Sequence, residues 1–173
     1  VALGLKDSLA GSKLQMTDEE MVKALTVLRT EVQKKLQEAS AAAGAANKKA
    51  GDEFLAANKS KPGVVTLPSG LQYKILKAGT GPKPKPDSNV EVHYKGTLIE
   101  GTVFDESISR GQPVTLNVGQ VIKGWQEAMP LMPVGSKWQL FIPGNLAYGE
   151  RGAGDTIGPN ATLIFEVELL AIK

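Results

Sequence analysis

The sequence predicts an α+β protein, in which a long α-helical arm precedes an antiparallel β-sheet wrapped over a short α-helix. Composition changes near Pro62, because all ten prolines lie at or after this residue. Before it, apolar side chains recur every three or four positions, which is the period of a helix. After it, short runs of alternating apolar and polar residues are separated by Gly and Pro, which is typical of strands. We therefore expect a helical arm at 1–61 and a β-rich domain at 62–173.

Overall composition excludes several classes of function. The chain of 173 residues has a net charge of +2, too close to neutral to indicate nucleic-acid binding. It has no cysteine and a single histidine, His93, which excludes thiol catalysis, zinc–cysteine sites and histidine-rich metal sites. No apolar run approaches the ~20 residues that span a bilayer. We therefore expect no metal, no cofactor, no nucleic acid and no membrane span.

The beginning of the chain suggests that part of the protein is missing. It starts at Val1 rather than Met, so we expect a processed or truncated form without a signal peptide. Residues 1–10 resemble the remnant of a helix, with Leu5 and Leu9 four positions apart and Gly11 as a C-terminal stop.

The long helix has a clear start. Thr17 and Glu20 form a capping box, in which each side chain accepts a hydrogen bond from the other residue's backbone N–H. No strong breaker follows before Pro62, so the helix is predicted over about 18–58. Gly44 and Gly51 are expected to weaken it by up to ~1 kcal/mol each relative to alanine.

The apolar stripe of this helix changes character along its length. Its large residues should pack against another surface, so this half, with residues 1–16, is interpreted as part of a dimerisation or docking module. Its alanines bury little area, so that half is interpreted as an exposed spacer; the alternative is a helix folded back on the β-rich domain. The stripe comprises Met21, Leu25, Leu28, Val32, Leu36, Ala39, Ala43, Ala46 and Ala50.

The β-rich domain is predicted to contain five or six strands and one short helix. The expected strands alternate in polarity and end at glycine or proline. The expected helix begins at Trp125, whose ring either fills the core or forms the apolar floor of a cleft. The predicted strands are 71–76, 90–98, 102–105, 114–118, 138–142 and 161–172, and the helix is 125–129.

Familiar catalytic motifs are absent from this domain. His93 has no serine and acid partners that would form a triad. The glycine-rich loop at 149–154 leads into a strand, so it offers no helix N-terminus to phosphate. What remains is an aromatic set, Tyr94, Phe104, Trp125, Tyr148 and Phe165, which Val121, Ile122 and Ile157 can join.

Five motifs in this domain resemble the FKBP-type peptidyl-prolyl isomerases. They are VHYKG at 92–96, GTVFD at 101–105, VIKGW at 121–125, LAYG at 146–149 and ATLIFEVEL at 161–169. They occur in the family's order over about 68–173. The helical arm, with KPGVV at 61–65 and LPSGL at 67–71, is similar to the bacterial macrophage infectivity potentiator (Mip) group of this family.

The resemblance implies an FKBP-like fold and peptidyl-prolyl cis-trans isomerase activity without a cofactor. By position it assigns catalysis to Asp105, Tyr148, Phe104 and Trp125, and substrate or macrolide binding to Tyr94, Arg110, Val121, Ile122, Ile157 and Phe165. Trp125 is then the floor of the cleft. Two positions depart from the best-known members: Val114 replaces a phenylalanine often found at the rim, and Ala153 replaces a histidine that can occur in the flap.

The resemblance also implies partners. These are proline-containing polypeptides, macrolide inhibitors such as tacrolimus and rapamycin, and a second copy of the chain bound through the N-terminal helical region. It favours the bacterial envelope, although the cytoplasm is possible. An alternative function is a chaperone or peptide-binding module that uses the same cleft without turnover.

Overall fold

The computed structural model describes residues 17–173. The chain divides into two compact units, Val1–Ser40 and Ala41–Lys173. Helix α2 (Asp18–Lys59) contributes to both units, and its extent agrees with the predicted helix. The helix expected at residues 1–10 lies outside the described residues.

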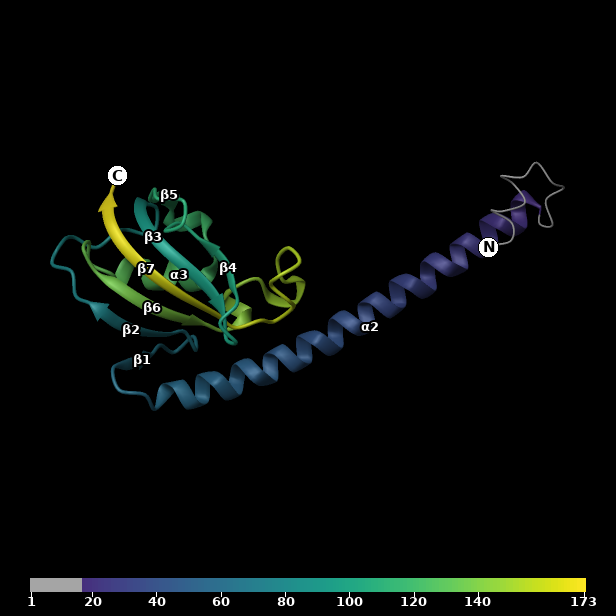
Figure 1. Ribbon diagram of the computed structural model, residues 1–173, viewed down its shortest axis with the longest axis horizontal. Coiled ribbons are helices and arrows are strands. Elements are labelled where there is room, and N and C mark those ends of the chain that lie inside the picture. Colours follow the sequence, from purple (N-terminus) through teal and green to yellow (C-terminus); the bar gives the residue numbers. More distant parts are fainter. Residues whose placement is uncertain (1–16) are drawn as a thin grey trace. The chain divides into compact units, whose positions relative to one another are not determined.

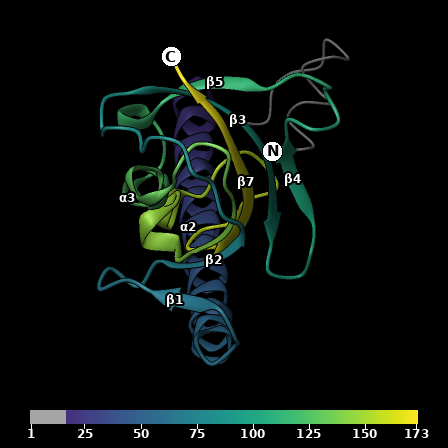
Figure 2. The ribbon, with the colours of Figure 1, turned by 90° about the vertical axis from the view of Figure 1, so that its left-hand side faces the viewer.

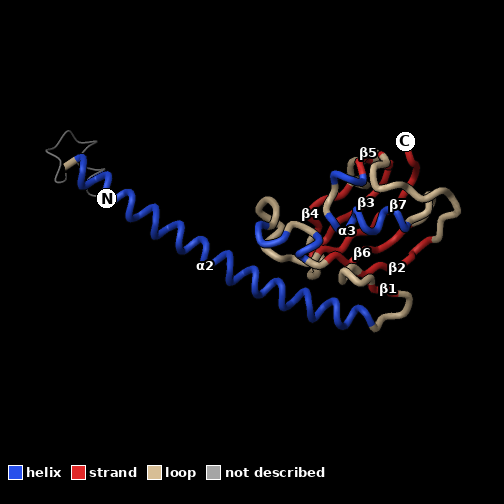
Figure 3. The backbone as a smooth tube through the Cα atoms, turned by 180° about the vertical axis from the view of Figure 1, so that it is seen from behind, coloured by secondary structure: helices blue, strands red, loops and turns tan. Residues whose placement is uncertain are grey.

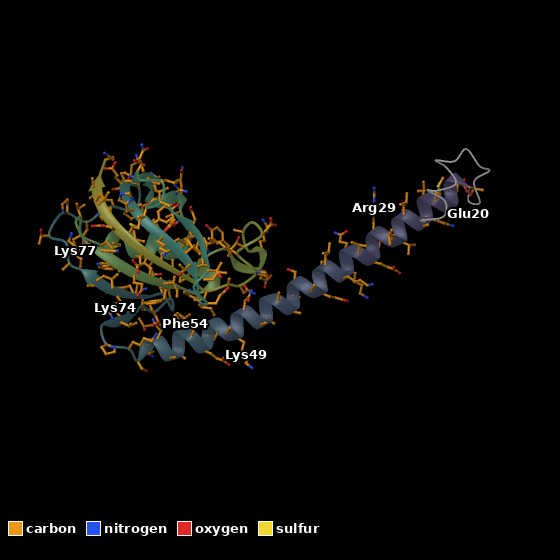
Figure 4. The ribbon with its side chains drawn as sticks, viewed as in Figure 1. Glu20, Arg29, Lys49, Phe54, Lys74 and Lys77 are labelled. Atoms are coloured by element: carbon orange, nitrogen blue, oxygen red, sulfur yellow. The ribbon has the colours of Figure 1, made fainter. Side chains whose placement is uncertain are left out.

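The start of α2 is the predicted capping box. The backbone N–H of Thr17 donates to Glu20 Oε2 over 2.9 Å, and the N–H of Glu20 donates to Thr17 Oγ1 over 3.3 Å. These two bonds satisfy backbone donors that a helix N-terminus otherwise leaves free. Figure 4 labels Glu20 and Arg29 on this first stretch of α2, and both side chains are exposed.

Large apolar side chains of the first unit face solvent in the single chain. Six of them are between 44% and 65% exposed, and they are Val22, Leu25, Val27, Leu28, Val32 and Leu36. The sequence predicts that the large residues of the stripe pack against another surface, and no residue that the structure describes covers these six.

The second unit contains one antiparallel sheet of seven strands, in the order β1-β2-β6-β7-β3-β4, with β5 also paired to β3 (Figure 1, Figure 2). The longest pairing joins β3 to β7, with Tyr94 opposite Val167 and Gly96 opposite Phe165. The strands are β1 (Val64–Thr66), β2 (Gln72–Lys77), β3 (Asn89–Leu98), β4 (Val103–Glu106), β5 (Val114–Asn117), β6 (Lys137–Ile142) and β7 (Leu163–Ile172). The short edge strand β1 is additional to the predicted set.

A short helix, α3 (Lys123–Ala128), packs on one face of this sheet. Figure 3, seen from behind, shows α3 in front of β3, β6 and β7. Gly124 makes the approach possible, because a Cβ there would lie 2.5 Å from Ile142 Cγ2 on β6. The core between helix and sheet includes Trp125, Ala128, Leu140 and Ile142. The predicted architecture is confirmed: a helical arm is followed in the chain by an antiparallel sheet that wraps over a short helix.

Four short 3₁₀ helices connect these elements. They occupy the turns on either side of α3 and the loop after β6. They are η1 (Val118–Gln120), η2 (Met129–Leu131), η3 (Gly144–Leu146) and η4 (Gly149–Arg151).

The last part of α2 belongs to the same compact unit as the sheet, which corrects the exposed-spacer interpretation. The two units meet at 40/41 rather than at the compositional boundary of 61/62. The alanines of the predicted stripe are indeed exposed. The helix contacts the sheet domain through another face, on which Gly44, Gly51 and Asn58 are buried.

Close backbone approach explains this choice of face. A Cβ at Gly51 would lie 2.2 Å from Thr162 Oγ1, so only glycine fits there. Farther along the helix, the ring of Phe54 packs 6.0 Å from that of Phe141. Asn58 donates to Gln72 Oε1 over 2.9 Å, and both residues are buried. In Figure 4 the labelled Phe54 points towards the strands, whereas Lys49 points away.

Candidate functional site

A cavity of about 590 Å³ opens between α3, the strands β3 to β5 and the loop that follows β6. Its walls are mostly apolar and aromatic, with one carboxylate at the edge. The lining residues are Tyr94, Phe104, Asp105, Leu116, Gln120, Val121, Ile122, Trp125, Tyr148, Ala153, Gly154, Thr156, Ile157 and Phe165. Pockets of this size, apolar with a few convergent polar groups, are typical ligand sites.

Aromatic rings packed edge to face form the floor of the cavity. The Trp125 ring lies 5.6 Å from the Tyr94 ring and 5.3 Å from the Phe165 ring, at angles of 86° and 84°. Phe104 meets Phe165 at 5.4 Å and 84°. These are favourable geometries for aromatic pairs. Trp125 is only 4% exposed, so its ring is fixed by its neighbours and presents one rigid apolar surface.

Two glycines allow this arrangement. Gly96 on β3 lies under two rings, and a Cβ there would be 2.6 Å from Phe104 Cε2 and 2.8 Å from Phe165 Cε1. Gly124 brings the start of α3 onto Ile142 and so places Trp125 above the sheet. In the sequence, both glycines stand out only as members of the motifs at 92–96 and 121–125.

A hydrogen-bonded group of three side chains forms the polar edge of the cavity. The Tyr94 hydroxyl donates to Asp105 Oδ2. Arg110 donates to Asp105 Oδ1 over 3.1 Å and to the Tyr94 hydroxyl over 3.2 Å. Because Asp105 and Arg110 are about half exposed, this ion pair orients the carboxylate and contributes little to stability. Each carboxylate oxygen of Asp105 therefore accepts a hydrogen bond from a different partner, Oδ2 from Tyr94 and Oδ1 from Arg110.

The same contacts affect the protonation of the edge. Partial burial, and then the hydrogen bond to Asp105, raise the pKa of Tyr94 above its ordinary value. Hydrogen bonds to Tyr94 and Asp105 raise the pKa of Arg110. Tyr94 therefore stays a hydroxyl donor, and Arg110 stays a cation, at neutral pH.

Ser107 holds the backbone behind this edge. Its hydroxyl accepts from the N–H of Tyr94 over 2.9 Å, and its own N–H donates to the Tyr94 carbonyl over 2.9 Å. The His93 ring lies 3.1 Å from the same hydroxyl, from Nδ1 to Oγ. Ser107 is fully buried, so Tyr94 is fixed from both its backbone and its side chain.

The loop after β6 forms the remaining wall. Ala153 and Ile157 exchange two backbone hydrogen bonds, of 2.8 and 3.1 Å, which close the loop on itself. Tyr148 is 41% exposed at the mouth of the cavity. Partial burial, and then the negative charge of Asp105, raise the pKa of the Tyr148 hydroxyl, so this group is a hydrogen-bond donor at neutral pH.

Comparison with known proteins decides the family of this fold and cavity. Residues 81–170 match the family described as FKBP-type peptidyl-prolyl cis-trans isomerase, and residues 1–75 match the domain amino-terminal to it. The chain is 50% identical to "Outer membrane protein MIP" of Legionella longbeachae, covering 100% of this chain and 74% of that protein. This chain belongs to the FKBP-type peptidyl-prolyl cis-trans isomerases.

Three further similarities extend over nearly all of the FKBP chain. It is 46% identical to "Peptidyl-prolyl cis-trans isomerase Mip" of Coxiella burnetii over 99% of this chain and 75% of that protein. The crystal structure of FkpA from Escherichia coli matches with a TM-score of 0.85 at 37% identity, covering 99% of this chain and 80% of that one. Against FkpA of Aeromonas hydrophila, at 49% identity over 98% of this chain, the chain spans 63% of the relative's length.

The structure brings nearly all of the predicted site residues of the FKBP domain to the cavity. Nine of them line it: Tyr94, Phe104, Asp105, Val121, Ile122, Trp125, Tyr148, Ile157 and Phe165. Arg110 does not line the cavity and contacts it through Asp105 and Tyr94. Of the two departures from the family, Ala153 lines the cavity and Val114 does not.

Several residues of the FKBP site escaped the sequence analysis. Leu116, Gln120, Gly154 and Thr156 line the cavity, and Ser107 supports it from behind. Gly154 is the last residue of the glycine-rich loop at 149–154, which was considered only for phosphate binding, and Thr156 follows this loop. Leu116 alternates with polar neighbours on β5, which was the available signal for an inward-facing side chain.

Residues 17–173 contain no cluster of three side chains suited to hold a metal ion. In the same range, no helix combines the length and apolar character needed to cross a membrane.

Proposed function

We propose that the cavity floored by Trp125 is the active site of this isomerase, and that it accelerates rotation about X–Pro bonds in polypeptides and so assists protein folding. The observation that carries this proposal is the combination of a rigid apolar floor with a single oriented carboxylate at its edge. Such a site can take a proline ring into the cavity while the preceding carbonyl lies beside Asp105.

The proposed mechanism follows from the peptide bond. Rotation is opposed by amide resonance, with a barrier of ~18–20 kcal/mol. An aromatic cavity strips water from the amide, which removes hydrogen bonds that reinforce the double-bond character, and its shape favours the twisted bond. The Tyr148 hydroxyl holds a substrate carbonyl. Asp105, oriented by Tyr94 and Arg110, interacts with the carbonyl that rotates.

The test is a protease-coupled isomerisation assay on short X–Pro peptides. Phe104→Ala removes one aromatic wall, and we expect kcat/KM to fall by about tenfold or more, because apolar truncation in a binding pocket costs ~1–3 kcal/mol. Thermal unfolding of the same variant checks that the domain is folded. Unchanged turnover in a folded Phe104→Ala variant would show that this cavity is not the active site.

We also propose that the first unit forms a homodimer through the exposed large residues of the apolar stripe, Leu25, Leu28, Val32 and Leu36. Large apolar side chains that face water along one side of a helix favour association, because burying them stabilises a dimer. Leu28→Glu with Val32→Glu should convert the dimer to a monomer in sedimentation experiments and leave turnover of short peptides within twofold. A wild-type monomer at micromolar concentration would contradict this.

A chaperone or peptide-binding function that uses the same cavity without turnover is the second candidate, because its apolar walls offer a surface to unfolded chains. Suppression of aggregation by an Asp105→Ala variant that lacks isomerase activity would support it, whereas loss of both activities together would not.

We propose further that macrolides such as tacrolimus and rapamycin compete for this cavity, and that the protein acts in the bacterial envelope. The apolar cavity supports the first proposal, and inhibition of the peptide assay tests it. The name "Outer membrane protein MIP" of one relative supports the second, and fractionation of the source bacterium tests it.

A further inference from the structure

The loop after β6 has two faces, and only one of them belongs to the cavity. On that face Tyr148, Ala153, Thr156 and Ile157 line the wall. The loop base is closed by the N–H of Asn160, which donates to the Gly149 carbonyl over 2.7 Å. Ile157 is buried and lies three positions before Asn160 at the base of the loop. A displacement of the base therefore moves the Ile157 wall.

The other face of the loop lies against α2, within the second compact unit. Asn47 Nδ2 donates to the Pro159 carbonyl over 2.9 Å. Gly44, on the same face of α2, lies so close that a Cβ would be 3.3 Å from Pro159 Cβ. Gly158 leaves room for the amide, because a Cβ there would be 2.8 Å from Asn47 Nδ2. Within residues 17–173, this is the one hydrogen bond that joins α2 to the loop.

We propose that Asn47 is a positioning residue of the isomerase, whose amide fixes the Pro159 carbonyl and thereby holds the Ile157 wall in the conformation that binds the proline-containing chain. This inference rests on the proposed function of the cavity. Through Asn47, the C-terminal half of α2 then has a role in substrate binding. A side chain without a donor at this position leaves the Pro159 carbonyl without its partner and releases the base of the loop.

The effect should fall on substrate binding rather than on rotation. The polar edge of the site consists of Tyr94 on β3 and Asp105 on β4. Arg110 and Ser107 hold these two residues in place, and neither of them is hydrogen-bonded to α2. Asn47 acts on the opposite wall, which contributes apolar contact. Loss of the amide is therefore expected to raise KM three- to tenfold and to leave kcat within twofold.

The experiment compares two substitutions that remove the donor with one that keeps it. Asn47→Asp has the same shape but places an acceptor against the Pro159 carbonyl, Asn47→Leu is apolar, and Asn47→Gln retains the amide. Asn58→Asp is the matched control, because Asn58 is on the same helix and its amide donates to Gln72 on β2, away from the loop. KM and kcat are measured on short X–Pro peptides.

The Ile157 methyl resonance supplies a readout that does not require activity. It lies in the aromatic cavity, so displacement of the wall changes its chemical shift, and Ile157→Val identifies it. Ile142, packed beneath α3, is the internal reference. We expect the Ile157 signal to move in Asn47→Asp and Asn47→Leu, to stay near its wild-type position in Asn58→Asp, and to return towards it in Asn47→Gln.

Several results would overturn the inference. One is an unchanged KM and an unchanged Ile157 signal in either folded donor-free variant. Another is an equal rise of KM in Asn58→Asp, which would assign the effect to helix docking in general. If neither donor-free variant folds, Asn47 is a structural residue only. A wild-type protein without isomerase activity would refute the proposed function instead, and the Ile157 signal would still decide the role of Asn47.

Discussion

The hydroxyl groups of Tyr94 and Tyr148 are the titratable donors of the cavity, and both have a raised pKa. Partial burial is the leading cause for each, and the nearby Asp105 carboxylate adds to it. A raised pKa means that the folded protein holds these protons more tightly than the unfolded chain, whose tyrosines titrate near about 10. The two residues therefore contribute stability that is complete below about pH 10 and is lost as the pH rises through their folded pKa values.

The upward direction of these two pKa shifts leads to a prediction at alkaline pH. The free energy of unfolding of the wild type should fall more steeply above about pH 10 than that of a Tyr94→Phe/Tyr148→Phe variant, which lacks both groups. Denaturant unfolding at a series of pH values, with tyrosinate absorbance followed in parallel, provides the measurement. Parallel curves for the two proteins would show that neither hydroxyl is perturbed by the fold. Between pH 6 and about 9 these two groups should cause no change in activity.

Glycine acts at the residue scale in a way that composition conceals. Gly96 is conspicuous only as the end of a motif, yet two aromatic rings of the cavity occupy the space where a side chain would be. The same is true of Gly124 beneath α3. In both places the missing Cβ lets a large ring or branched side chain pack directly on the backbone.

Helix α2 shows what such glycines do for an element. Gly44, Asn47 and Gly51 share one face, and this face meets the segment from Gly158 to Thr162. Glycine within a helix costs ~1 kcal/mol relative to alanine, and the contacts of this face offset that cost. The exposed alanines on the other faces favour the helix intrinsically.

The prediction for this element is that Gly51→Ala destabilises the protein although alanine is the better helix former. A Cβ at Gly51 would lie 2.2 Å from Thr162 Oγ1 and 3.1 Å from its Cβ, so overpacking should cost ~1–3 kcal/mol. Ala50→Gly, at the exposed neighbouring position, should lose only ~1 kcal/mol through helix propensity. Urea unfolding measures both.

Adding Thr162→Ala to Gly51→Ala removes the hydroxyl in conflict and should restore part of the loss. A Gly51→Ala protein that is more stable than the wild type would mean that α2 does not approach the loop so closely.

At the scale of the whole molecule, the compact units divide within α2 rather than at its end. The contacts of Phe54 with Phe141 and of Asn58 with Gln72 belong to the second unit. Gln72 also donates to the Leu55 carbonyl over 2.8 Å. Removing all of α2 therefore exposes a surface of the sheet domain that the helix normally covers.

A pair of truncations tests this division. A chain that starts at Ala41 should unfold with a free energy within ~0.5 kcal/mol of the sheet domain in the whole chain, because distant, independent parts contribute additively. A chain that starts at Val64 should be less stable by ~2–4 kcal/mol, from lost apolar burial and buried hydrogen bonds. Thermal and denaturant unfolding measure the difference. Equal stability of the two truncations would restore the spacer interpretation for all of α2.

Much of this molecule was predictable because its signals are local. Helix α2 follows from its capping box and three-four periodicity, and strands such as β3 and β7 follow from alternation, since backbone geometry sets both periods. The motifs around Tyr94, Asp105 and Trp125 indicated the family and nine of the residues that line the cavity. The helix and the strands depend on neighbours within a few positions along the chain, whereas the cavity residues were assigned from the resemblance of these motifs to the family.

The tertiary structure decided which face of α2 packs, where the units divide and what supports the cavity. A search for apolar stripes selects the alanines of α2, whereas the packed face is rich in glycine and asparagine, which contribute only when another part of the chain lies against them. Ser107 and Asn47 likewise stand out only through the carbonyls and amides that they meet. Contacts between residues distant in sequence leave no periodic trace, because they depend on how surfaces fit together and not on the spacing of residues along the chain.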